Sequence, residues 1–228
     1  MKILKDAGGF EILTPKEELE RQLLAIEIAG RTCYQSEKGK VTEESAEKFV
    51  RMLLRRGHES VIEHTSLTVK FLGCSRGFTH EMVRHRLASF SQESTRYVDE
   101  SDARFVVPPH RDENMLVRLD DGRKVSFRQM LCEVERFYRA LRQDGWLPED
   151  ARQILPIATE AELVTTANFR EWRHIFKRRT QQAAHWEIRA VMCKLLTTLQ
   201  KIVPAVFEDF VFAGTDKNGV PFFVQGRD

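Results

Sequence analysis

The sequence predicts an α+β fold, with helices packed on a β-sheet in a single compact domain spanning residues 1–228. Segments with helical periodicity are interleaved with short segments in which apolar and polar residues alternate. No low-complexity segment and no repeat of solenoid length occurs among them. A chain of 228 residues with 42% hydrophobic content has enough apolar surface to bury a substantial core.

Capping signals predict the first two helices. Thr14 and Pro15 begin a helix that runs to about Arg31, since proline is favoured at the first helical position. Thr42 caps the second helix, and Gly57 ends it.

Alternation predicts a half-buried strand over residues 65–71, with Leu67, Val69 and Phe71 on one side. Helical periodicity then returns over roughly 75–88, and residues 89–96 are expected to be extended or looped. The remaining predicted elements are a strand at 104–107, a turn at 120–122, a helix over 127–144, a short helix over 148–155, a strand at 163–166, a helix capped by Asn168 and a long helix over 181–202.

Composition excludes several classes of protein. A net charge of +2 is too small for a protein whose main ligand is nucleic acid. The amino terminus lacks a signal-peptide pattern and no apolar run approaches membrane-spanning length, so we expect a cytoplasmic protein without membrane contact. The cysteines are far apart without a CxxC pair, which favours free thiols over a disulfide scaffold or zinc knuckle; they are Cys33, Cys74, Cys132 and Cys193.

The most informative motif is Arg84-His85-Arg86, followed after seven residues by Ser94-Thr95-Arg96. Guanidiniums meet phosphate oxygens two at a time, and hydroxyl groups complete such a site. A solvated basic surface is the ordinary alternative for a charge run. The small and apolar residues 87–90 argue against it and favour a partly buried anion site.

A second cluster, residues 57–64, contains two histidines and two glutamates. His58 and His64 do not fit the HExxH zinc motif, because six residues do not place both rings on one helical face. A polar ligand-facing loop is therefore favoured over a metal centre, and we expect no metal. A metal-dependent hydrolase around these histidines remains a weaker alternative.

Two further segments carry cations. Arg170 and His174 are four residues apart and share a helical face that can point at an anionic ligand. Arg152 lies in the first turns of a predicted short helix, where most arginines form surface ion pairs. These cations also leave open a module that binds nucleotides or RNA, although no RNP-like aromatic pattern accompanies them.

The motif of residues 84–96 resembles the defining motif of the flavin-dependent thymidylate synthases, and each fixed position of that motif is present. Other segments resemble the same family in the same order; they are 57–64, 151–156, 166–170 and Arg179 with Trp186-Glu187. Four ordered blocks over roughly residues 30–190 make chance similarity an inadequate explanation.

This resemblance implies a methyltransferase that converts dUMP to dTMP. The implied carbon donor is 5,10-methylenetetrahydrofolate, which yields tetrahydrofolate, and the implied cofactor is FAD with NADPH as reductant. It also implies a homotetramer with active sites shared between subunits. None of the cysteines has the Pro-Cys setting of the classical thymidylate synthases, so that class is disfavoured.

The resemblance also assigns roles residue by residue. Arg179 is the implied catalytic residue, because a cation beside N3 of the pyrimidine makes C5 more nucleophilic. The implied dUMP-binding residues are Glu81, Arg84, Gln92, Glu93, Ser94, Thr95, Arg96, Arg152 and Arg179. The implied FAD-binding residues are His58, Ser60, Glu63, Arg84, His85, Arg86, Gln92, Asn168, Phe169, Arg170 and His174, with Ser60 reaching FAD from a neighbouring subunit.

Three positions depart from the family pattern. Ser91-Gln92 stands where many relatives have Asn-Glu, His174 where Asn is common, and Ala183 where His is common. These differences affect individual contacts expected with FAD, since a glutamine can donate a hydrogen bond that an ionised glutamate cannot.

Overall fold

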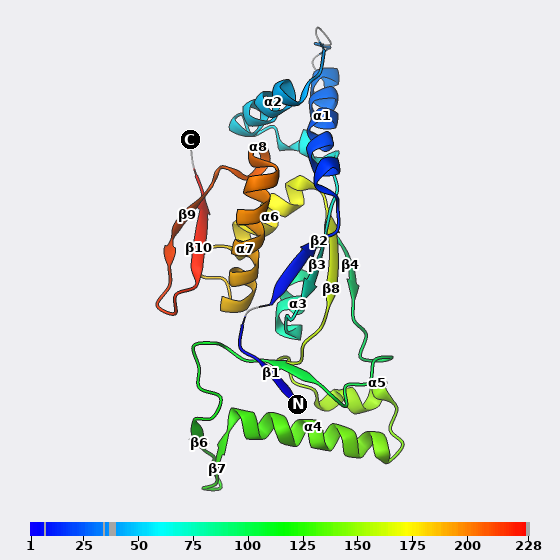
Figure 1. Cartoon of the computed structure of the whole chain (residues 1–228), viewed down its shortest axis with the longest axis vertical. Coiled ribbons are helices and arrows are strands. Elements are labelled where there is room, and N and C mark those ends of the chain that lie inside the picture. Colours follow the sequence, from blue (N-terminus) through cyan, green and yellow to red (C-terminus); the bar gives the residue numbers. More distant parts are fainter. Residues whose placement is uncertain (7, 34, 37–39, 227–228) are drawn as a thin grey trace. The chain divides into compact units, whose positions relative to one another are not determined.

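The structure is a computed structural model that describes residues 1–6, 8–33, 35–36 and 40–226. Helices alternate with short strands along the chain (Figure 1), which confirms the predicted α+β class. The chain forms two compact units. The first unit contains Met1–Gly9, Phe71–Met82 and Ser91–Leu163, and the second unit contains Phe10–Lys70, Val83–Phe90 and Val164–Asp228. The single domain expected over residues 1–228 stays a prediction.

The helices and strands follow one another in this order: β1 (Lys2–Leu4), β2 (Gly9–Ile12), α1 (Lys16–Cys33), α2 (Glu43–Arg55), a 3-10 helix (Glu59–Glu63), β3 (Leu67–Leu72), α3 (Arg76–Met82), β4 (Ser89–Gln92), β5 (Arg104–Val106), β6 (Leu116–Arg118), β7 (Lys124–Ser126), α4 (Phe127–Gln143), α5 (Pro148–Ala151), a 3-10 helix (Arg152–Ile154), β8 (Leu163–Ala167), α6 (Phe169–Arg179), α7 (Trp186–Ile202), α8 (Pro204–Phe207), β9 (Phe210–Thr215) and β10 (Pro221–Gln225). Within the described residues, no helix is both long and apolar enough to cross a membrane.

Side-chain caps explain where several helices begin. Thr42 and Ser45 form a reciprocal capping box at the start of α2, and Ser126 and Gln129 form another at the start of α4. At α6 the side chain of Asn168 accepts a hydrogen bond from the backbone N–H of Glu171, as predicted. These caps satisfy backbone donors that have no partner inside the helix.

The second unit is built round a sheet and an aromatic core. Its four strands have the order β2-β3-β8-β4, and β3 buries alternate residues as its sequence predicts. Trp172 of α6 is fully buried and donates a hydrogen bond from Nε1 to the carbonyl of Leu67 in β3, at 3.0 Å. Phe176 packs edge-on against Phe207 at a centroid distance of 5.5 Å. This packing fixes α6 against the sheet and α8.

Helices α1 and α2 approach closely at Gly30. A Cβ atom added at Gly30 would lie 2.4 Å from Cε1 of Phe49, so a larger residue there would require the Phe49 ring to move. The contact holds the α1–α2 pair together in the second unit.

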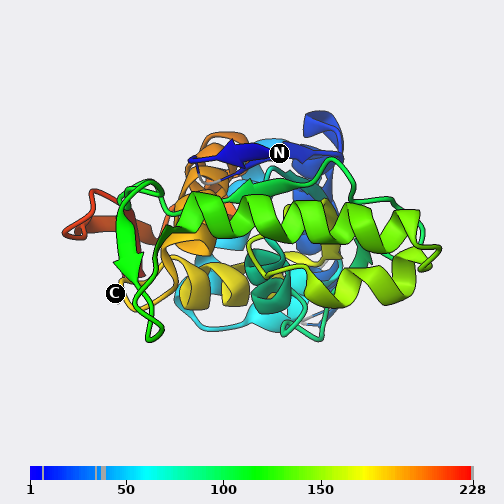
Figure 2. The same cartoon turned by 90° about the horizontal axis from the view of Figure 1, so that it is seen from below.

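The first unit contains the long helix α4, with the β6–β7 hairpin at its beginning (Figures 1 and 2). Strands β1 and β5 pair in parallel, with Ile3 opposite Phe105. Phe105 and Leu131 of α4 are buried in the same apolar cluster, which therefore joins the strand pair to the helix.

Several features differ from the sequence predictions; strands β1 and β2, for example, were not predicted. Helix α3 ends at Met82 rather than near 88, so Arg84 and His85 lie in the turn that follows it. Helix α7 begins at Trp186 rather than at 181. The β9–β10 hairpin was not predicted, although its turn contains the hairpin signal Asn218-Gly219.

Candidate functional site

The predicted site residues divide between the two units largely by their predicted ligand. All the residues predicted for FAD except Gln92 belong to the second unit. All those predicted for dUMP except Arg84 and Arg179 belong to the first unit. Each group is described within its own unit.

The second unit contains a cavity of about 600 Å³ beside the beginning of α6. Four residues predicted to bind FAD line it, namely Glu63, Asn168, Arg170 and His174. Its other lining residues are Glu59, Leu87, Glu171, Arg173, Lys177 and Gln225. The exposed cations Arg170 and Lys177 can face a diphosphate, although Arg170 is paired with Glu63. The amide nitrogen of Asn168 can donate to a ligand, while its oxygen accepts from the N–H of Glu171. The cavity thus offers both cations and carboxylates to a bound molecule.

Ion pairs hold the wall formed by the 3-10 helix of residues 59–63. Arg170 pairs through Nη1 with Glu63, and its Nε lies 4.0 Å from Glu59. These side chains are substantially exposed, so the pairs orient the arginine and contribute little to stability.

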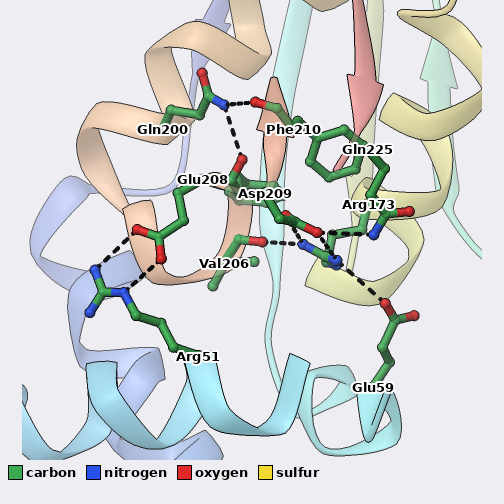
Figure 3. A network of polar contacts seen from close by, with 10 residues as sticks. Arg51, Glu59, Arg173, Gln200, Val206, Glu208, Asp209, Phe210 and Gln225 are labelled. Carbon is green, nitrogen blue, oxygen red and sulfur yellow. Dashed lines mark hydrogen bonds and ion pairs between the residues drawn. The ribbon is translucent and has the colours of Figure 1, made fainter. Parts of the chain in front are cut away.

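A buried arginine connects that wall to the carboxyl end of the chain (Figure 3). Arg173 is 4% exposed and both its Nη atoms lie 2.7 Å from Asp209, a bidentate pair. Its Nη2 is also 3.5 Å from Glu59, and Gln225 of β10 donates to Asp209 at 3.0 Å. Because Glu59, Arg173 and Gln225 all line the cavity, this network sets its shape.

His85 connects the arginine motif to α6. It is only 6% exposed, and its Nε2 accepts a hydrogen bond from Nε of Arg179 at 2.9 Å. Its Nδ1 lies 3.5 Å from Oε1 of Glu171, and the ring of His174 meets its own ring edge-on at 5.7 Å. The predicted catalytic arginine is therefore anchored by the central residue of the motif.

Burial changes the protonation of this cluster. Burial, together with the smaller effects of the charges of Arg179, His174 and Arg178, lowers the pKa of His85 to about 4. Burial also raises the pKa of Glu171 above its ordinary value, against the opposing effect of His174. His85 is consequently neutral near pH 7, as acceptance of a hydrogen bond from arginine requires.

Donor atoms of His85, Glu171 and His174 lie within 4.8 Å of one another, a spacing at which three ligands can share a metal ion. Among the described residues, this is the group of donors that comes together, and it does not include His58 or His64, around which the alternative metal site was considered. However, the lone pair of His85 Nε2 is already engaged by a cation, so this arrangement is used for hydrogen bonding.

The other residues predicted for FAD differ in exposure. Arg84 and Arg86 are exposed in the turn after α3, and His58 and Ser60 are exposed at the 3-10 helix. Phe169 is fully buried, with its ring edge-on to Phe207 at 5.8 Å. Its backbone N–H donates to Thr65, so the side chain serves the core.

The first unit contains a smaller cavity of about 290 Å³, lined by Arg76, Thr95, Arg152, Gln153 and Leu155. The Nη1 of Arg152 lies 3.3 Å from Oγ1 of Thr95, and its Nε donates to the carbonyl of Glu149 at 3.1 Å. The Nη1 of Arg76 is buried and has no hydrogen-bond partner among the described residues. Two guanidiniums and a hydroxyl thus surround a space that suits a phosphate group.

The segment of residues 92–96 contributes Thr95 to the lining of this cavity. Gln92 donates to Oγ1 of Thr79 at 3.0 Å, and Glu93 accepts from the backbone of Glu162 at 3.1 Å. Arg96 is half-exposed and pairs with Glu149 at 3.1 Å. The remaining two predicted residues of the segment differ in exposure: Ser94 is half-buried, whereas Thr95 is 3% exposed.

Glu81, the remaining residue predicted for dUMP, is half-buried on α3 in the first unit. Arg84 and Arg179, predicted for the same ligand, lie in the second unit.

Sequence reasoning missed several residues that line these cavities, among them Arg76 and Glu171. Arg76, at the beginning of α3, lines the first-unit cavity beside Arg152. Glu171 lies in the first turn of α6, where an acidic residue is ordinary, and only its burial against His85 distinguishes it. Neither had a local sequence signal beyond its charge.

Comparisons with known proteins identify the family of this chain. The family model of Thy1, described as thymidylate synthase complementing protein, matches residues 17–205. The flavin-dependent thymidylate synthase of Mycobacterium avium (strain 104) is 37% identical over 198 residues, covering 82% of this chain and 79% of the relative. That of Mycobacterium tuberculosis (strain ATCC 25618 / H37Rv) is 37% identical over 195 residues, covering 81% and 78%.

Solved structures show the same fold. The UMP/dUMP methylase PolB from Streptomyces cacaoi, bound with 5-Br dUMP, superposes with a TM-score of 0.70 at 24% identity, covering 91% of this chain and 96% of that one. The same protein bound with 5-Br UMP gives a TM-score of 0.68 at 26% identity, covering 91% and 95%. With its motif, its fold and the match over residues 17–205, the chain belongs to the Thy1 family, that of the flavin-dependent thymidylate synthases.

Proposed function

We propose that this protein methylates dUMP at C5 to give dTMP, with FAD as its cofactor and NADPH as the reductant. The carbon donor is 5,10-methylenetetrahydrofolate, and tetrahydrofolate is released. The observation that carries the proposal is the cavity of about 600 Å³ that gathers four of the residues predicted for FAD, in a chain of this family. The neighbouring PolB structures, which hold 5-bromo nucleotides, support a uracil nucleotide as the substrate.

The residues of this cavity would hold FAD by charge and hydrogen bonding. Arg170 and Lys177 supply cations for its diphosphate, while Asn168 and His174 offer polar groups. Phe169 contributes through its backbone position, because its side chain is buried in the core. When bound and reduced by NADPH, FAD supplies the hydride of the reaction.

Further contacts with FAD are proposed for His58, Ser60, Glu63, Arg84, His85, Arg86 and Gln92. Most of these are exposed, as contact with a ligand requires, whereas His85 is buried. Ser60 is proposed to reach FAD of a neighbouring subunit.

The first-unit cavity is proposed to take the phosphate of dUMP. Arg152 and Arg76 face it with guanidiniums, and Thr95 offers a hydroxyl. Arg152 is already oriented by Thr95 and Glu149, so binding requires little reordering of its side chain. The further nucleotide contacts are proposed for Glu81, Arg84, Gln92, Glu93, Ser94 and Arg96.

Arg179 is the proposed catalytic residue. Its guanidinium cannot lose its proton near neutral pH, and the hydrogen bond to His85 restricts its position. Placed at the N3 edge of the pyrimidine, it favours loss of the N3 proton, which makes C5 electron-rich and able to attack the one-carbon unit.

A homotetramer with shared active sites is proposed as the working assembly. Exposed apolar residues support it, since Phe127, Met130 and Phe137 lie along α4 and Phe212 lies on β9. Light scattering at working concentration tests it, and a monomer at that concentration would count against it.

The cofactor proposal is tested by the flavin spectrum. Protein reconstituted with FAD should be yellow, should bleach with NADPH, and should recover its absorbance when methylenetetrahydrofolate and dUMP are added. A colourless protein that does not take up FAD would reopen the alternatives of a nucleotide- or RNA-binding module and a metal-dependent hydrolase.

A further inference from the structure

Glu171 is buried, which is unusual for a carboxylate in the first turn of a helix. It is 6% exposed and lines the cavity of the second unit, yet its Oε1 points towards His85 Nδ1 at 3.5 Å. A buried carboxylate loses hydration, and its pKa is raised accordingly, so its retention here calls for a compensating interaction.

The hydrogen bond from Arg179 requires one particular tautomer of His85. Arginine nitrogens only donate, so His85 Nε2 must present its lone pair at 2.9 Å from Arg179 Nε. In a neutral imidazole the proton then lies on Nδ1, the nitrogen that faces Glu171. The three groups therefore form a chain of contacts. The carboxylate of Glu171 favours a proton on Nδ1 of His85, and this leaves the lone pair of Nε2 to accept the hydrogen bond from Arg179.

We propose that Glu171 is a positioning residue, which holds the Nδ1–H tautomer of His85 and thereby keeps the guanidinium of Arg179 in its reactive place. This rests on the proposed function for the role of Arg179, but the contact itself is independent of it. A carboxylate that orients a functional histidine through its second nitrogen is a recurrent arrangement in proteins.

The same geometry argues against a metal ion at this cluster. With Nε2 accepting from Arg179 and Nδ1 carrying a proton, His85 has no lone pair to give to a metal. Glu171 and His174 alone would leave two ligands, beside the guanidinium of Arg179.

The test compares Glu171→Ala and Glu171→Gln with Glu44→Ala. Glu44 is an exposed glutamate in the first turn of α2, so it controls for loss of a helix-start charge. The first readout is the tautomer of His85 in purified protein labelled with ¹⁵N-histidine, with His85→Gln identifying the signal. We expect Nδ1–H in the wild type and in Glu171→Gln, whose amide oxygen still accepts, and a mixed tautomer in Glu171→Ala.

The second readout is steady-state kinetics with FAD-loaded protein. Glu171→Ala should lower kcat and kcat/KM for dUMP by the same factor, about tenfold, with FAD affinity unchanged. Glu171→Gln should recover most of the rate, and Glu44→Ala should match the wild type.

Two results would overturn the proposal. One is a His85 tautomer that is the same in Glu171→Ala as in the wild type. The other is a loss of FAD affinity in Glu171→Ala with kcat unchanged, which would make Glu171 a flavin contact. If the wild type formed no dTMP, the proposed function would fail, while the tautomer would still decide the role of Glu171.

Discussion

Arg179 Nε lies 2.9 Å from His85 Nε2, so the last residue of α6 is tied to the middle of the arginine motif. These residues are 94 positions apart in the sequence and have opposite properties, a permanent cation and a buried neutral ring. The contact makes the position of Arg179 depend on His85 remaining neutral.

Acid should destabilise the protein through His85. Its pKa is lowered from 6.5 to about 4, mainly by burial, so this contribution to stability is full above pH 6.5 and is lost as pH falls towards 4. The loss is on the order of 3 kcal/mol at most. Urea unfolding from pH 7 to 4, at fixed protein concentration, should show a steeper decline for the wild type than for His85→Gln, and parallel curves would contradict this.

Arg179→Ala should abolish most turnover while the protein still folds and binds FAD. Loss of one group that stabilises charge in a transition state costs about 100- to 1000-fold in rate. Arg178→Ala, at the exposed neighbour on the same helix, is the matched control. Unchanged dTMP formation by Arg179→Ala would remove Arg179 from the mechanism.

Arg76→Ala and Arg152→Ala should weaken dUMP binding without affecting FAD. A charge-assisted hydrogen bond contributes about 1.5–3 kcal/mol, which corresponds to roughly 10- to 100-fold in affinity. Calorimetric titration with dUMP measures this, with Arg123→Ala, an exposed arginine paired to Asp121, as the control. Equal affinities in all three variants would show that the first-unit cavity does not take the phosphate.

Asn168 should show two separable roles. Asn168→Ala removes the cap of α6 and should lower the free energy of unfolding by about 1 kcal/mol, whereas Asn168→Ser keeps a capping oxygen and most of that stability. Both variants should bind FAD more weakly, because the amide also lines the cavity. Wild-type FAD affinity in Asn168→Ser would leave Asn168 with the cap alone.

Local signals predicted the elements whose ends are capped or whose faces alternate. Thr42 and Asn168 cap their helices as expected, and β3 buries Leu67, Val69 and Phe71. The end of α3 was missed because the residues after Met82 have good helical propensity, whereas in the structure His85 is turned inwards to α6. The end of α3 therefore depends on the contact of His85 with Arg179, which lies 94 positions further along the sequence.

Sequence motifs indicated some residues of the candidate site, whereas others had no recognisable sequence pattern. Spacing brought out Arg170 with His174 and the anion-binding motif, and the structure places the first pair in one cavity. Arg76 and Glu171 carried no distinguishing pattern, because an arginine or glutamate at the start of a helix is usually a solvated residue. Only the structure marks them as parts of a site, since Arg76 lines a cavity that Arg152 also lines and Glu171 is buried beside His85.

The central claim is that the chain converts dUMP to dTMP with a flavin, and product formation tests it most directly. Purified protein is incubated with dUMP, methylenetetrahydrofolate, NADPH and FAD, and the nucleotides are separated and identified by mass. We predict dTMP in the complete mixture, none when FAD or NADPH is left out, and a rate about 100- to 1000-fold lower when Arg179→Ala replaces the wild type. An FAD-loaded protein that leaves dUMP unchanged in the complete mixture would contradict the account.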